Sequence, residues 1–134
     1  MRTEMEMENK EVKSFHLEVM NWKSNLQTLG DELYFLKKLL VSKAFEQNTP
    51  NLYEILEKFS TKLKDIEEAS SMLYEKLHQH ENQLGGLIEC DTISCDHYYN
   101  KNHKKMKRIY NDFCKMFNQQ KNEIYKVTAN ILKQ

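Results

Sequence analysis

VKSFHLEVMNWKSNLQTLGDELYFLKKLL, residues 12–40, decides the fold. Large apolar side chains recur along this stretch at alternating steps of three and four residues. They are Val12, Phe15, Val19, Trp22, Leu26, Leu29, Leu33, Leu36 and Leu40. A mean step of about 3.5 residues puts them on one face of an α-helix and is typical of helices that supercoil around one another. Gly30 costs only about 1 kcal/mol of helix propensity relative to alanine, so we predict one helix over about 8–46.

Two further segments carry the same period. The second predicted helix covers about 51–88, with the stripe Leu52, Leu56, Phe59, Leu63, Ile66, Ser70, Leu73, Leu77, His80, Leu84 and Leu87. The third covers about 92–132, with the stripe Tyr99, His103, Met106, Tyr110, Phe113, Phe117, Gln120, Ile124, Val127 and Ile131. Each of these two stripes contains two polar positions, whereas the first contains none.

The connections between the three predicted helices are short. Pro50 is the only proline, and Thr49 before it is predicted to cap the second helix, with Pro50 in the first turn. Three glycines and one proline in 134 residues are too few for a turn-rich β protein. We therefore predict an all-α fold in one domain, 1–134: an elongated, up-down-up antiparallel three-helix bundle with coiled-coil-like heptad packing.

Charge and composition exclude several classes of protein. Twenty basic and twenty acidic side chains leave no net charge, which argues against nucleic acid as the main partner. The first residues are charged and predict no signal peptide, and no run is apolar enough to predict a membrane span. Three cysteines form an odd, late cluster that is a poor disulfide framework. We predict a cytoplasmic protein that binds no membrane.

Histidines gather where the second helix meets the third. An antiparallel register puts His80 level with His16 and His103. Three imidazoles are the ligand set of a catalytic zinc site with one open position. The competing interpretation is a polar layer that fixes the register of the helices. We favour the polar layer and predict no cofactor, because few carboxylates lie on the stripes; a metal-binding bundle remains the alternative hypothesis.

A second candidate metal site contains Cys90, Cys95 and His97. The four-residue gap between the cysteines is at the edge of the spacing seen in zinc sites, and a fourth ligand is missing nearby. The sequence contains no Cys-x-x-Cys motif that would favour redox chemistry. We interpret these thiols as ordinary reduced cysteines at a helix end.

The third predicted helix begins with a basic cluster: Lys101, Lys104, Lys105, Lys107 and Arg108. Basic residues next to aromatic ones can hold phosphate and stack bases. The bundle brings acidic residues of the same chain to this end, namely Glu4, Glu6, Glu8, Glu11, Glu75, Glu81, Glu89 and Asp91. Pairing within the molecule is therefore the favoured interpretation, and a nucleic-acid accessory role is the weaker alternative.

Apolar residues away from the stripes predict a surface for a partner. They are Met20, Tyr34, Phe35, Val41, Phe45, Tyr53 and Tyr125. The chain has no nucleophile elbow, phosphate loop or glycine-rich cradle, so we predict no enzymatic activity. A contiguous apolar patch would indicate a second copy of the chain or another protein. The leading hypothesis is a small, non-enzymatic helical-bundle protein that acts through protein–protein interaction, by self-association.

Overall fold

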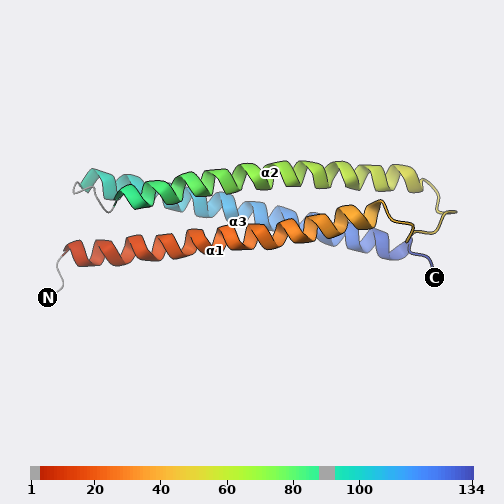
Figure 1. Ribbon diagram of the computed structural model, residues 1–134. Helices are drawn as coiled ribbons and strands as arrows, with labels where there is room; N and C mark the ends of the chain where they lie inside the picture. The colour runs from red at the N-terminus through yellow and green to blue at the C-terminus, as the bar shows by residue number, and fades with distance from the viewer. Residues whose placement is uncertain (1–3, 88–92) are drawn as a thin grey trace.

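The chain folds into three long helices. The computed structural model describes residues 4–87 and 93–134, with side chains over 13–84 and 99–134. Its helices are α1 (Glu4–Leu40), α2 (Leu52–Leu87) and α3 (Ile93–Asn130). Figure 1 shows them lying alongside one another, with the start of α1 and the C-terminus at opposite ends of the molecule. The prediction of an all-α helical bundle is confirmed.

Ion pairs between α1 and α2 define their relative direction. Lys23 Nζ lies 2.9 Å from Glu81 Oε2, and Lys37 Nζ lies 2.7 Å from Glu67 Oε2. Residue numbers therefore fall along α2 as they rise along α1, so these two helices are antiparallel. The Lys37–Glu67 pair is exposed and contributes about 1 kcal/mol or less, so it reports the register more than it determines the stability.

Contacts between α1 and α3 run in the opposite sense. Asn25 Nδ2 donates a hydrogen bond to Tyr110 Oη at 2.9 Å, and Lys121 Nζ lies 3.2 Å from Glu32 Oε2. Numbers rise together along the two helices, which are therefore parallel. No helix in the described ranges is long and apolar enough to cross a membrane.

The apolar stripes form the core. Its buried members are Val19, Trp22, Leu26, Leu29, Leu33, Leu36, Leu40, Phe45, Phe59, Leu63, Ile66, Leu73, Leu77, Leu84, Met106, Tyr110, Phe113, Phe117 and Ile124. All but one were assigned to a stripe from the sequence; the exception is Phe45. The polar stripe positions Ser70, His80 and His103 are buried as well.

The first helix is shorter than predicted, because α1 ends at Leu40 and not at residue 46. Ser42 makes the turn that ends it. Its backbone N–H and its Oγ both donate to the Leu39 carbonyl, at 3.1 and 2.7 Å, and its Oγ accepts from the Ala44 N–H at 3.3 Å. A serine side chain that forms hydrogen bonds with nearby backbone groups in this way competes with the helical hydrogen bonds.

Phe45 was predicted to lie on the surface available to a partner, and this is wrong. Its side chain is only 1% exposed. The backbone around it forms an isolated antiparallel bridge between Phe45 and Leu132. Glu46 N–H donates to the Ile131 carbonyl at 2.8 Å, and Lys133 N–H donates to the Ala44 carbonyl at 2.9 Å. The bridge fixes the connection between α1 and α2 so that Phe45 enters the core.

The predicted cap of α2 is also wrong. Thr49 Oγ1 donates to the Glu46 carbonyl at 2.6 Å, and α2 begins only at Leu52. The first helical hydrogen bond runs from Ile55 N–H to the Asn51 carbonyl at 3.0 Å. Asn51 is therefore the capping residue, with φ of 58°. Asparagine adopts this left-handed conformation more readily than most residues.

A substitution at Gly30 tests whether the surface of α1 is open at this position. A Cβ atom added to Gly30 would meet nothing within 4 Å. We expect Gly30→Ala to raise the free energy of unfolding by about 1 kcal/mol, because alanine has the higher helix propensity. Urea denaturation followed by circular dichroism measures the change. Ala69→Gly, on an exposed position of α2, is the reverse control and should lower it by about the same amount. A loss of stability in Gly30→Ala would contradict the open environment of this position.

Candidate functional site

The most distinctive polar feature of the core is a pair of histidines. His80 of α2 and His103 of α3 are each 2% exposed. His80 Nε2 lies 2.9 Å from His103 Nδ1, and the two rings stack with their centroids 5.2 Å apart. The register expected from the sequence put these residues at the same level, and the structure places them in direct contact.

The neighbours of the pair set the direction of its hydrogen bonds. Asn102 Nδ2, which can only donate, lies 3.2 Å from His80 Nδ1. His80 therefore accepts at Nδ1 and donates from Nε2 to His103 Nδ1. His103 then carries its proton on Nε2, which faces Glu18 Oε1 at 3.4 Å. We call these four residues, Asn102, His80, His103 and Glu18, the histidine chain. Each neutral imidazole in it uses one donor and one acceptor.

Burial keeps both imidazoles uncharged. Burial, and to a smaller extent the nearby charge of His103, lowers the pKa of His80 to about 4. Burial also lowers the pKa of His103, against the opposing effects of the hydrogen bond to Glu18 and of the Glu18 charge. The aromatic rings of Phe15 and Trp22 stack on the His103 ring, at centroid distances of 4.0 and 5.1 Å. These rings and the helices around the pair leave it inaccessible to a substrate, so it is poorly placed for catalysis.

Further charged groups lie around the residues that contact the histidine pair. Lys107 Nζ lies 3.5 Å from the second carboxylate oxygen of Glu18. Between α1 and α2, the hydrogen bond from Lys23 is the main reason that the pKa of Glu81 is lowered, and the charges of His16 and His78 act in the same direction. Among the described side chains, Glu18 is the only acidic residue hydrogen-bonded to the pair.

His16 does not join the two buried histidines. It is half-buried and interacts with Glu81, while Phe15 takes the stripe position and stacks on His103. Among side chains 13–84 and 99–134, no three His, Cys, Asp or Glu residues are grouped so that they could hold a metal ion. The alternative of a three-imidazole layer is thus not formed by these residues. Cys90, Cys95 and His97 lie outside the described side chains.

Part of the basic cluster of α3 forms an ion pair with an acidic residue of the same chain. Lys107 pairs with Glu18, and all five members of the cluster are exposed: Lys101, Lys104, Lys105, Lys107 and Arg108. Most of the acidic residues predicted to face them lie outside the described side chains. Pairing of the whole cluster within the molecule therefore stays a prediction.

Six of the seven residues predicted to contact a partner are exposed, and the seventh is the buried Phe45. The six are Met20, Tyr34, Phe35, Val41, Tyr53 and Tyr125. Tyr34 is 65% exposed and Phe35 is 57% exposed. The sequence interpretation missed Leu17 and Met72, which are equally exposed. Their apolar character at positions off the stripes was the signal that could have found them.

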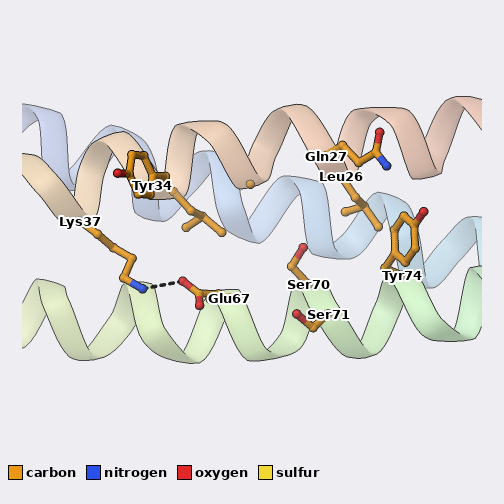
Figure 2. A pocket seen from close by; sticks show the side chains of 10 residues that line it. Leu26, Gln27, Tyr34, Lys37, Glu67, Ser70, Ser71 and Tyr74 are labelled. Atoms are coloured by element: carbon orange, nitrogen blue, oxygen red, sulfur yellow. Dashed lines mark hydrogen bonds and ion pairs between the residues drawn. The ribbon is translucent and has the colours of Figure 1, made fainter.

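A groove of about 480 Å³ lies between α1 and α2 beside Tyr34. Its lining residues are Leu26, Gln27, Gly30, Leu33, Tyr34, Lys37, Glu67, Ser70, Ser71 and Tyr74. Figure 2 shows Tyr34 and Tyr74 projecting from different helices near its two ends, with the Lys37–Glu67 ion pair crossing between the helices. The groove exists because Gly30, Ser70 and Ser71 are too small to fill the space between the helices.

Comparison with known proteins gives no match: no family model fits the chain, and no curated protein or solved structure is significantly similar to it. No activity or partner can be transferred from a relative. The functional hypothesis therefore depends on the exposed apolar side chains, the groove and the histidine chain.

Proposed function

We propose that this is a small, non-enzymatic helical-bundle protein that acts through protein–protein contact, and that the contact is self-association. One observation carries the proposal: the groove over Gly30 is bordered by the exposed Tyr34, with the exposed Phe35 next to it. Aromatic side chains beside a concave site are the usual anchors of protein interfaces. A second copy of the chain offers both the aromatic anchors and the groove that receives them.

The energetics support such a contact. Burying one large apolar side chain contributes about 1.5–3 kcal/mol, and α1 exposes Tyr34, Phe35 and Met20, followed by Val41 just after its end. In a two-fold symmetric dimer the same surface is used on both copies, so each favourable contact occurs twice. Pairing two bundles side by side would extend the coiled-coil-like packing predicted from the stripes.

We also propose that the protein is cytoplasmic. Cys114 is a free, half-buried thiol. The odd number of cysteines is typical of a reducing compartment, where thiols persist without pairing.

Self-association is tested by sedimentation velocity. We expect the wild-type chain to sediment as more than one copy, and the double variant Tyr34→Glu/Phe35→Glu to sediment as a monomer, because two buried carboxylates would oppose the contact. Met72→Glu is the matched control. The exposed fraction of Met72, 64%, is close to that of Tyr34, but Met72 lies on α2 and does not line the groove. This variant should stay associated. A wild-type chain that remains monomeric at high concentration would contradict self-association.

A further inference from the structure

We propose that the histidine chain is an acid-sensitive latch that holds together one end of the bundle. In this proposal, the buried pair accepts one proton on His103 while the three helices stay packed. A second proton, on His80, then separates the helices at this end. The proposal goes beyond the proposed function and does not depend on self-association.

The geometry accommodates the first proton. When the Asn102 amide rotates its oxygen toward His80, His80 Nδ1 can bind a proton from solvent. His80 then passes its Nε2 proton to His103 Nδ1 and stays neutral, while His103 becomes an imidazolium with N–H groups on both nitrogens. Asn102 Nδ2 also donates to the exposed Gln83 side chain at 3.1 Å, and that amide can rotate to match. Every hydrogen bond of the histidine chain is retained. Those between Asn102 and His80 and between His80 and His103 reverse their direction.

The surroundings of His103 stabilise a single positive charge. Its Nε2–H group faces the Glu18 carboxylate, and a hydrogen bond between two charged groups is stronger than a neutral one. The stacked rings of Phe15 and Trp22 are polarisable neighbours of this cation. His80 has no carboxylate bonded to it among the described side chains, so the first charge belongs on His103.

The second proton finds no such arrangement. Protonated His80 would point an N–H group from Nε2 at the N–H group of His103 Nδ1, across the present separation of 2.9 Å. Two buried cations would then share one carboxylate, that of Glu18, which Lys107 also contacts. Among the described side chains, further charged or titratable groups close by are His16 and Lys23 on α1 and His78 and Glu81 on α2. Glu81 is already paired with Lys23, so it leaves the second charge uncompensated.

The opening should be confined to this end of the bundle. Among the described side chains, His80 and His103 are the only buried groups that gain a charge on acidification. The core from Leu26 toward Phe45 is apolar along α1 and has no acid-sensitive contact of this kind. Separation of the helices around the pair would hydrate both imidazoles without unfolding the rest of the bundle.

Trp22 is the only tryptophan of the chain and stacks on His103, so its fluorescence reports both steps. The wild-type chain is titrated with acid in the presence of a chelator, and helicity is followed in parallel by circular dichroism. We expect a first step in which the emission intensity falls at a constant wavelength, because an imidazolium next to an indole quenches it. The second step, near the pKa of His80 at about 4, should shift the emission to the wavelength of a hydrated indole while most of the helical signal remains.

Three variants separate the latch from general acid unfolding. His80→Gln keeps a polar side chain that takes up no proton, and should show the first step without the second. Glu18→Gln should move the first step to lower pH, because the carboxylate opposite His103 is gone. His16→Gln/His78→Gln removes the other histidines of this end among the described side chains and should retain both steps. A wavelength shift that persists in His80→Gln, or a wild-type shift that coincides with complete loss of helicity, would overturn the proposal.

Discussion

Replacing Phe45 with alanine should lower the free energy of unfolding by about 3–5 kcal/mol. The loss has two sources: the burial of the phenyl ring is lost, and a cavity remains because neighbouring groups relax only in part. Phe45 is 1% exposed and belongs to the core although it lies outside every helix. Its position depends on the backbone bridge to Leu132, so the effect also tests the attachment of the α1–α2 connection to the segment that follows α3.

Phe35→Ala is the matched control for this prediction. The residue type and the substitution are the same, but Phe35 is 57% exposed on α1. Its removal should change the free energy of unfolding by about 0.5 kcal/mol or less in the monomer. Both variants are compared with the wild type by urea denaturation at low protein concentration. Equal losses for the two variants would show that Phe45 is not in the core.

Acidification from about pH 7 to about pH 5 should lower the free energy of unfolding by about 2 kcal/mol. His80 has a pKa of 6.5 when unfolded and about 4 when folded. Below pH 6.5 the unfolded chain therefore binds more protons than the folded chain. The free energy of unfolding falls as the pH drops from 6.5 toward about 4. The lowered pKa of His103 acts in the same direction. The lowered pKa of Glu81 has its effect only below its ordinary value of 4.5, outside this range.

The double variant His80→Leu/His103→Leu should abolish this dependence. Replacing both partners of a buried hydrogen bond by apolar groups of similar size is often neutral or stabilising, whereas removing one partner leaves the other unsatisfied. We therefore expect a variant at least as stable as the wild type near neutral pH, with a flat stability profile down to about pH 5. Urea denaturation at several pH values measures both. A slope that survives in this variant would assign the dependence to other groups.

The core was predictable from the sequence because its signal is local. Leucines such as Leu26, Leu33 and Leu63 recur with the period of a helix surface, and every one of these three is buried. The end of α1 was not predictable in the same way. The stripe ends at Leu40, where the helix ends, and Phe45 lies outside the stripe. Phe45 enters the core because it pairs with Leu132 from the far end of the chain. A contact between such distant segments leaves no periodic signature.

The candidate site was predictable in part. The positions of His80 and His103 on their stripes predicted that they would meet, and they do. His16 is one position off its stripe, and Phe15 fills the place next to His103. Glu18, which completes the histidine chain, is also off the stripe. Its role depends on side-chain directions that spacing alone does not fix.

Ring-to-ring contacts of His103 in solution test the arrangement most directly. In the structure, α1, α2 and α3 of one chain pack against one another with the histidine pair between α2 and α3. Nuclear Overhauser effects from the His103 ring to the rings of Phe15 and Trp22, which lie 4.0 and 5.1 Å away between centroids, are the predicted result. Effects from His103 only to its neighbours along α3 would contradict the account.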